Sequence, residues 1–139
     1  MAKFARIINN MVKQVILIDD NDCLDSNGDE SEEVGAAFCR KLFGEDTDTV
    51  WLQTSFNTHH GVHSTVGKTA LRGNFASCGM SYDPEGDVFV RIKPYPSWIY
   101  NSVTSDWDPP VAYPDDGKDY TWNENTKAWD RILPYDPDD

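Results

Sequence analysis

What this sequence lacks argues against several protein classes. Its three cysteines, Cys23, Cys39 and Cys78, are widely spaced, so neither a disulfide framework nor a zinc site built from Cys-x-x-Cys pairs is expected. No apolar run approaches the roughly 18 residues of a membrane-spanning helix, and we expect no membrane partner. Basic residues are scarce as well: 12 Lys and Arg stand against 24 Asp and Glu, which gives a net charge of −12. Because phosphate binding needs clustered basic side chains, this charge argues against a nucleic-acid partner.

Acidic residues are absent from one long stretch of the chain. Residues 49–82 contain no Asp or Glu, but they contain Lys68, Arg72 and three histidines. Residues 19–33, in contrast, contain eight acids and no base. This asymmetry predicts a solvated acidic exterior and a contact segment that can approach a partner. The alternative interpretation is that the acid-free stretch is simply interior strand and polar loop.

Two partial motifs for phosphate and calcium binding fail on their spacing. In residues 61–69, which resemble a P-loop, five residues separate the two glycines, where the motif has four. An EF-hand loop with Gly28 in its sixth position would begin at Cys23 and end at Val34, so the anchoring Asp and the bidentate Glu are both missing. We therefore expect a solvated acidic loop and no nucleotide site.

The histidine and cysteine residues do not form a convincing metal or catalytic site. His59, His60 and His63 have only Cys78 as a candidate fourth zinc ligand, and no carboxylate in their segment to orient the imidazoles. Neither Cys39, on a predicted helix, nor Cys78, in a predicted strand, has the electropositive surroundings of a nucleophile. The sequence therefore predicts a protein that is not an enzyme and that holds no cofactor and no metal.

Local patterns in the first third predict a β-hairpin followed by one helix. Residues 4–8 and 12–18 flank Asn9-Asn10, a pair that tolerates the positive φ angles of a tight hairpin turn. The continuous apolar residues that end the second strand predict burial on both of its faces. Ser31 can cap a helix over about residues 31–43, with acids in its first turn, bases in its last turn and Gly44 to end it.

The middle of the chain predicts further strands separated by a polar loop. The Pro and Gly of residues 83–86 stand where a tight turn needs them, so the flanking segments form a hairpin. The predicted elements are a strand at 50–56, a polar loop at 57–73, a strand at 74–82 and a return strand at 87–92.

The last third is rich in proline and tryptophan, and two of its segments resemble each other. Each ends in Thr-x-x-Trp, which predicts that Trp98 pairs with Trp107, and Trp122 with Trp129, across two small hairpins. The aromatic residues could form a platform for a sugar or a peptide, or they could be the core of these hairpins or an assembly contact.

Together these patterns predict an α+β fold that is mostly β. We expect an antiparallel sheet built from hairpins, with one short helix and a Pro/Trp-rich C-terminal arm. Residues 1–92 are expected to form a compact β-rich domain, and residues 93–139 a hairpin arm packed on that domain or on a partner.

Several segments distributed along nearly the whole chain resemble one group of proteins. They include Trp51-x-Gln53-Thr54-Ser55-Phe56-Asn57-Thr58, Ala70-Leu71-Arg72-x-Asn74-Phe75-Ala76, Lys93-Pro94-Tyr95-Pro96-Ser97-Trp98 and Tyr120-x-Trp122-Asn123-Glu124. In these segments the chain is similar to small virion proteins of marine tailed bacteriophages, of the cyanophage and pelagiphage kind. It departs from them at His59-His60 and at residues 90–92, where more proline is expected.

The resemblance implies a structural role in a phage particle, made in the host cytoplasm, and no reaction. A small acidic β domain suits a capsid decoration (cement) protein that binds the major capsid protein or other virion proteins on the head surface. A homo-oligomer, a tail, fibre or portal accessory protein, and a host-glycan-binding module remain alternatives. The residues expected to contact the partner are in the acid-free loop and the aromatic arm: His63, Lys68, Arg72, Tyr95, Trp98 and Tyr113.

Overall fold

The computed structural model describes residues 1–44, 47–64 and 71–134. The chain divides into two compact units. The first contains Met1–Ile92 together with Ser102–Asp106, and the second contains Lys93–Asn101 and the residues from Trp107 onward. The short segment Ser102–Asp106 therefore belongs with the first unit, although the sequence interpretation placed all of residues 93–139 in the arm.

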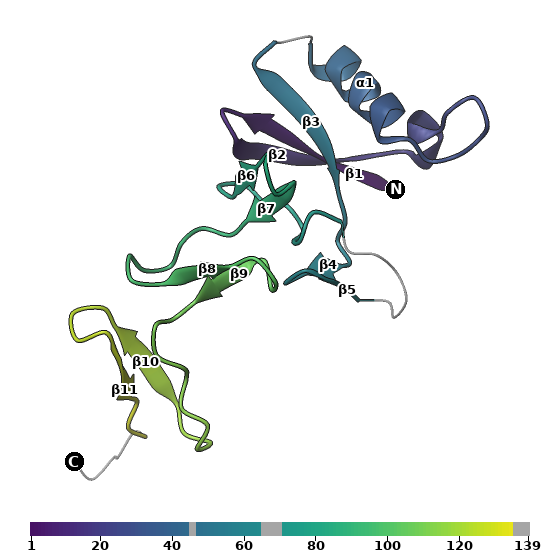
Figure 1. Cartoon of the computed structure of the whole chain (residues 1–139). Coiled ribbons are helices and arrows are strands. Elements are labelled where there is room, and N and C mark those ends of the chain that lie inside the picture. Colours follow the sequence, from purple (N-terminus) through teal and green to yellow (C-terminus); the bar gives the residue numbers. More distant parts are fainter. Residues whose placement is uncertain (45–46, 65–70, 135–139) are drawn as a thin grey trace. The chain divides into compact units, whose positions relative to one another are not determined.

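A five-stranded antiparallel sheet forms the centre of the first unit (Figure 1). Its order is β3-β1-β2-β6-β7, and the predicted fold class, mostly β with one helix, is confirmed. The strands are β1 (Ala2–Ile8), β2 (Met11–Ile18), β3 (Thr49–Thr54), β6 (Ser81–Asp83) and β7 (Val88–Val90).

The predicted first hairpin is confirmed by its turn geometry. Asn9 and Asn10 have φ angles of 52° and 61°, the left-handed conformation that a two-residue hairpin turn requires. The register shifts between Arg6 and Ile7, where an extra residue of β2 is accommodated.

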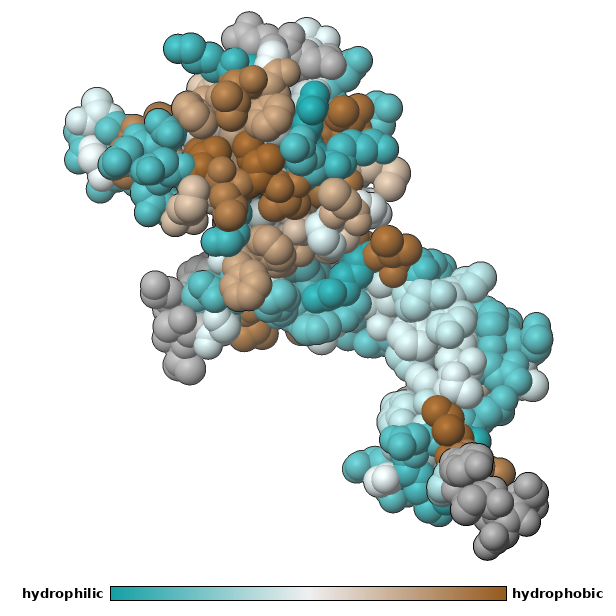
Figure 2. Space-filling view, turned by 180° about the vertical axis from the view of Figure 1, so that it is seen from behind, coloured by the Kyte–Doolittle hydropathy of each residue, from teal (hydrophilic) through white to brown (hydrophobic). Residues whose placement is uncertain are grey.

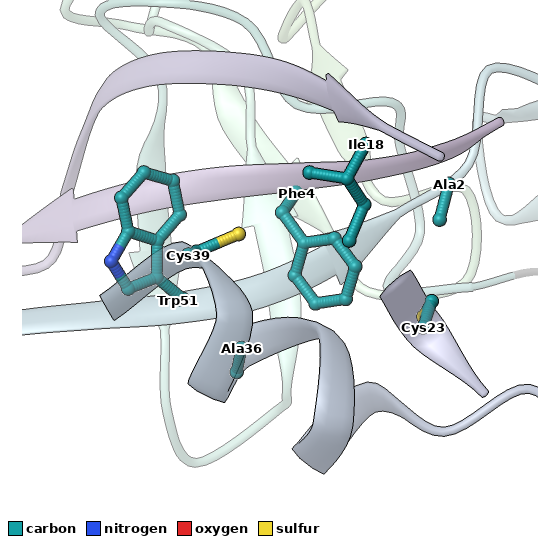
Figure 3. Packing of buried hydrophobic residues seen from close by; sticks show 7 residues of the cluster. All are labelled: Ala2, Phe4, Ile18, Cys23, Ala36, Cys39 and Trp51. Atoms are coloured by element: carbon teal, nitrogen blue, oxygen red, sulfur yellow. The ribbon is translucent and has the colours of Figure 1, made fainter. Parts of the chain in front are cut away.

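The predicted helix is also confirmed, as α1 (Glu32–Phe43), and it follows a 3₁₀ turn, η1 (Asp20–Cys23). Ser31 Oγ accepts a hydrogen bond from the backbone N–H of Val34, and Gly44, with φ 97°, ends the helix. Within the described residues, no helix combines the length and apolar character needed to cross a membrane. The helix packs on one face of the sheet through a buried cluster, drawn in Figure 3, of Ala2, Phe4, Ile18, Cys23, Ala36, Cys39 and Trp51.

The prediction that the second strand is buried on both faces is wrong for the end of β2. β2 stands in the middle of the sheet order, but β6 pairs with it only at Met11, so β6 and β7 do not cover its last residues. On the face away from α1, a second cluster of Ala76, Met80 and Phe89 covers Ala5 of β1, which is completely buried. Leu17 of β2, on the same face, lies outside that cluster and is 57% exposed. An apolar run predicts burial, but it does not show how far along a strand its neighbours will cover it.

Gly35 is the point of closest approach between α1 and the sheet. A Cβ atom placed there would lie 2.3 Å from Cζ of Phe4 and 2.9 Å from Sγ of Cys23, and both residues are completely buried. We predict that Gly35→Ala destabilises the protein by about 1–3 kcal/mol through overpacking, although alanine is the better helix former. Urea denaturation of this variant and of Lys41→Ala, an exposed position of the same helix, tests the sign; a stabilised Gly35→Ala protein would contradict it.

Two predictions for residues 57–82 are wrong in detail. The polar loop contains a small hairpin of β4 (Thr58–His59) and β5 (Val62–His63), in which His60 and Gly61 adopt positive φ angles of 52° and 77°. The strand predicted at 74–82 shrinks to β6, because backbone groups ahead of it bond locally or to the loop. Phe75 N–H donates to the Thr58 carbonyl, and Met80 N–H donates to the Ser77 carbonyl.

Three hairpins share one local geometry. They are β6–β7, β8–β9 (Ile99–Asn101 and Asp106–Asp108) and β10–β11 (Tyr120–Asn123 and Ala128–Arg131). In each, two aromatic rings seven residues apart lie together, with centroids separated by 5.6, 5.4 and 5.1 Å in chain order. The residue two before the second ring has a φ of 50–54° in all three. The ring pairs are Tyr82–Phe89, Tyr100–Trp107 and Trp122–Trp129.

One of the two predicted tryptophan pairs is confirmed and the other is wrong. Trp122 and Trp129 are direct cross-strand partners, whereas Trp107 pairs with Tyr100. Trp98 precedes β8 and packs on Trp122 and Trp129, at centroid distances of 6.0 and 6.2 Å. The Thr-x-x-Trp repeat was real, but its first ring is Tyr100, two residues after the tryptophan that the sequence interpretation chose.

Candidate functional site

Within the acid-free stretch, the buried residue Thr58 ties the β4–β5 hairpin to the residues that follow it. The hydroxyl of Thr58 accepts a hydrogen bond from Leu71 N–H at 3.1 Å, and its carbonyl accepts one from Phe75 N–H at 2.7 Å. Thr58 is completely buried. The β4–β5 hairpin is therefore held at its base by residues that follow it in the chain.

Asn74 links three separate hairpins through one side chain. Its amide oxygen accepts from His60 N–H at 2.9 Å, in the β4–β5 turn. Its amide nitrogen donates to the carbonyls of Phe89, in β7, at 3.0 Å and of Ser105, in the β8–β9 turn, at 2.7 Å. Asn74 is completely buried, and its bonds to the Phe89 and Ser105 carbonyls form away from water, where an unpaired polar group is costly.

Gly73 allows this close approach. A Cβ atom at this position would lie 2.4 Å from Cγ2 of Val88 and 2.7 Å from Oγ of Ser105, and the φ of 74° also favours glycine. The backbone at Gly73 can therefore lie directly against β7 and the β8–β9 turn.

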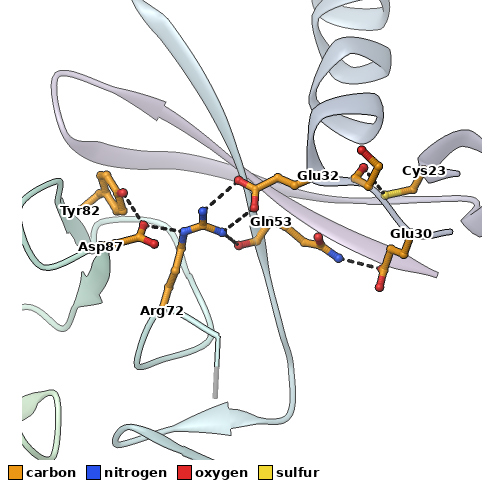
Figure 4. Close-up of polar contacts among 8 residues, drawn as sticks. Cys23, Glu30, Glu32, Gln53, Arg72, Tyr82 and Asp87 are labelled. Carbon is orange, nitrogen blue, oxygen red and sulfur yellow. Dashed lines mark hydrogen bonds and ion pairs between the residues drawn. The ribbon is translucent and has the colours of Figure 1, made fainter. Parts of the chain in front are cut away.

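Arg72 fixes the same segment to the helix and the sheet (Figure 4). Its guanidinium group makes a two-pronged bond to Glu32, at the start of α1, with both N–O distances 2.9 Å. It also donates to the Gln53 carbonyl at 2.9 Å and to Asp87 Oδ1 at 2.8 Å, and that same oxygen accepts from the Tyr82 hydroxyl at 2.5 Å. The Arg72 side chain is only 11% exposed, so its charge is neutralised inside the protein.

The pKa shifts in this network follow from these bonds. Burial alone would lower the pKa of Arg72, but the bonds to Glu32 and Asp87 outweigh it and raise the pKa above its ordinary value. Burial alone would raise the pKa of Asp87, yet the bonds from Tyr82 and Arg72 bring it below its ordinary value. Arg72 and Asp87 are therefore both charged at neutral pH.

Apolar side chains are exposed where the β4–β5 and β8–β9 hairpins, both bonded to Asn74, lie against each other. A Cβ atom on Gly61 would lie 2.9 Å from the Val103 carbonyl oxygen, so the β4–β5 and β8–β9 turns touch. Phe56, Val62 and Val103 are 61%, 66% and 85% exposed. We call Phe56, Val62 and Val103 the hairpin-tip surface. Phe56 is supported from beneath by an edge-on contact with Phe75, at a centroid distance of 5.7 Å.

Asp106, an acid beside this surface, forms an ion pair with Arg91 and lies against His60. Asp106, at the start of β9, lies 2.8 Å from Nδ1 of His60 and 3.9 Å from Nε of Arg91. The hairpin-tip surface therefore combines exposed apolar groups with little uncompensated negative charge, in a chain whose net charge is −12.

The structure places the predicted contact residues of the acid-free loop in different environments. His63 lines a cleft of about 320 Å³ together with Lys3, Gln53 and Phe56. Arg72 is engaged inside the first unit, and Lys68 lies outside the described residues. A partner contact by any of the three stays a prediction.

The predicted contact residues of the arm gather in the second unit. Tyr95 stacks on Trp98 with a centroid distance of 5.7 Å, and Tyr113 packs on Trp129 at 4.9 Å. The rings meet at tilted or edge-on angles, so they form a small aromatic core rather than a row of parallel faces. Their contact with a partner stays a prediction as well.

Sequence reasoning missed Asn74, Glu32 and Asp87. A signal was present, because Asn74 and Arg72 both belong to the segment Ala70-Leu71-Arg72-x-Asn74-Phe75-Ala76 that carries the phage resemblance. That segment was used only to recognise a family. Its polar residues, set among apolar ones, are typical of buried hydrogen-bonding hubs.

The acidic loop shows turn bonding of its own. Oδ1 of Asp25 accepts from the backbone N–H groups of Asn27 and Asp29, at 2.8 and 3.0 Å. Within residues 1–44, 47–64 and 71–134, no three His, Cys, Asp or Glu side chains are placed to hold one ion together. The expected absence of a resident metal stays a prediction.

No family model matches the chain, and neither does a curated protein or a solved structure.

Proposed function

We propose that this chain is a non-enzymatic structural protein of a tailed-phage particle, a decoration protein that binds the outside of the head and bridges capsid subunits. The proposal combines the sequence resemblance with the hairpin-tip surface. The observation that carries it is the exposure of Phe56, just before the β4–β5 hairpin, and of Val62, within that hairpin, which bonds of Thr58 and Asn74 hold in place. A docking surface that is already ordered loses little entropy on binding, so more of its contact energy appears as affinity.

The distribution of apolar surface supports docking through the first unit. Figure 2 shows brown and tan surface gathered over this unit, whereas the second unit is mostly teal and white. Leu17 and Val50, both on the sheet face away from α1, are 57% and 48% exposed and add to it. Burying such groups against capsid subunits would stabilise the assembled particle by mass action, without any chemistry.

Cryo-electron microscopy of virions, with the purified chain added back to particles that lack it, tests the proposal. We expect density for the first unit on the outer surface of the head, at a joint between capsid subunits. Density at the tail, a fibre or the portal would replace this function with an accessory role there. Binding to glycans with no density on the particle would favour a host-recognition module instead.

A charge placed on the hairpin-tip surface should prevent loading onto particles. We predict that Val62→Asp folds with a free energy of unfolding within about 0.5 kcal/mol of the wild type, because the position is exposed. Its affinity for heads should fall at least about tenfold, since a carboxylate would be desolvated in the contact. Co-sedimentation with heads measures this, and Val111→Asp, an exposed valine of the second unit, is the control. Equal loading of Val62→Asp and the wild type would show that another surface docks.

A further inference from the structure

A groove runs between α1 and β3, and none of its lining residues belongs to the hairpin-tip surface. Its volume is about 610 Å³. One helix face and one strand residue line it: Glu32, Glu33, Ala36, Arg40 and Trp51. Neither the phage resemblance nor the proposed docking surface uses these residues together.

Trp51 brings an unused hydrogen-bond donor to this groove. The residue is 2% exposed, and its indole Nε1 has no hydrogen-bond partner. Figure 3 shows the nitrogen on the edge of the ring turned away from Phe4 and Cys39. Other faces of the ring are occupied, because Phe43 packs on it at 5.3 Å and Arg6 lies 5.9 Å from its centroid. A buried N–H without an acceptor is rare in folded proteins and marks a place where a ligand can supply one.

The strand beside the groove is suited to pairing with an added strand. Among the described residues, β3 lies at one edge of the five-stranded sheet, and its six residues carry no charge. Natural edge strands usually carry charges or proline that prevent pairing. Arg72 already donates a hydrogen bond to the Gln53 carbonyl near one end of β3. An incoming segment would therefore pair with the backbone of β3 around Trp51. An extended peptide laid between a helix and an edge strand is a recurring mode of recognition, and its carbonyls would be acceptors for Trp51.

The charges along α1 indicate which kind of peptide segment the groove can bind. Glu33 is exposed in the first turn, next to Glu32, and both end the acidic run of residues 19–33. Glu32 is already paired with Arg72, so Glu33 and the acidic run provide the attraction at this end. Arg40 places the opposite charge two turns further along α1, which favours one direction of binding.

We propose that the groove between α1 and β3 binds an extended segment of a partner protein, with basic side chains at its Glu33 end and backbone carbonyls at Trp51. The segment adds to the edge of β3, and alternate side chains point into the groove and into solvent. This inference goes beyond the proposed function and does not depend on it, because it concerns another surface and can be tested on the isolated protein.

Titration of the isotope-labelled protein with an end-capped peptide, Lys-Lys ahead of a Val-Thr-Val-Thr segment, tests the proposal by NMR. We expect saturable shifts confined to the amides of α1 and β3 and to the indole N–H of Trp51, which is assigned by its loss in Trp51→Phe. The same peptide with Glu in place of Lys should bind at least about fivefold more weakly. An indole signal that does not move at saturation, or equal binding of the two peptides, overturns the proposal.

A matched pair of charge reversals separates the groove from general attraction to an acidic protein. Glu33→Lys and Glu85→Lys make the same change in net charge at exposed positions, the second in the β6–β7 turn. We expect Glu33→Lys to weaken binding of the basic peptide at least about fivefold, and Glu85→Lys to leave it within about twofold. Equal weakening by both variants would show non-specific binding and overturn the proposal. Because neither variant alters the hairpin-tip surface, head loading is measured independently.

Discussion

Replacing Arg72 with alanine is expected to lower the free energy of unfolding by about 2–3 kcal/mol, because it removes several charge-assisted hydrogen bonds of a nearly buried guanidinium group. The change leaves Glu32 without its two-pronged partner and Asp87 without its cation, and it releases the Gln53 carbonyl. It also detaches residue 72, which itself has a strained φ of 52°, from α1 and from the β6–β7 hairpin. Urea denaturation followed by circular dichroism measures the loss.

Arg40→Ala is the control for this prediction, because Arg40 lies on the same helix face but outside the Arg72 network. We expect Arg40→Ala to change stability by less than about 1 kcal/mol. A loss of similar size in both variants would show that Arg72 matters only through general charge. Arg72→Glu is expected to destabilise the fold for the same reason. It is therefore unsuited to testing whether the acid-free loop contacts a partner.

The bonds among Arg72, Asp87 and Tyr82 also make the stability of the protein depend on pH. The pKa of Asp87 is lowered in the folded state from its ordinary value of 3.8 by Tyr82 and Arg72, which outweigh its burial. Its contribution is therefore present above the unfolded pKa and is lost as the pH falls through the lower, folded pKa. The stability difference between the wild type and Arg72→Ala should accordingly narrow in that acidic range.

Asn74→Ala is expected to cost about 3 kcal/mol, because it leaves two buried carbonyls and one partly buried N–H without their partner. These groups are the carbonyls of Phe89 and Ser105 and the N–H of His60. The amide proton of His60 should also exchange with solvent faster than in the wild type, since opening of the β4–β5 turn no longer breaks its bond to Asn74. Denaturation and hydrogen exchange measure the two effects.

Asn125→Ala is the matched control, because Asn125 is an exposed turn residue of the β10–β11 hairpin. A change within about 0.5 kcal/mol is expected there. If Asn74→Ala were as mild, Asn74 would not hold the three hairpins together. The hairpin-tip surface would then need another source of order.

Features governed by neighbouring residues were predictable from the sequence. The Asn9-Asn10 turn, the helix capped by Ser31 and the turn at residues 83–86 all depend on short-range geometry, and the structure contains each of them. Hairpin pairing of Trp122 with Trp129 belongs to the same class, because the two strands are joined by a short turn. Such features follow from backbone preferences that a few residues determine.

Features that depend on distant partners were not predictable. From the sequence, Arg72 would be expected on the surface. Its nearly buried position depends on the bonds to Glu32, which lies 40 residues away in the chain. From the sequence, Asn74 would be expected in an exposed loop. Its burial depends on hydrogen bonds to residues as far as 31 positions away in the chain. Hydrophobic periodicity likewise predicted buried strands without indicating that Leu17, near the end of β2, would lie outside the buried cluster. The groove at Trp51 forms only where α1 and β3 lie side by side, so it too could not be predicted from the residues around Trp51 alone.

The three equivalent hairpins also imply an order of folding. Each contains its own ring pair and turn, so each can form within about 1–10 μs of being synthesised, without waiting for the rest of the chain. The bonds of Asn74 instead join His60, Phe89 and Ser105, so they can close only after residue 105 has left the ribosome. We expect the hairpin-tip surface to be the last part of the first unit to assemble. Until then its apolar residues stay on a loosely held loop, and a nascent chain lacks the ordered surface that the proposed docking function requires.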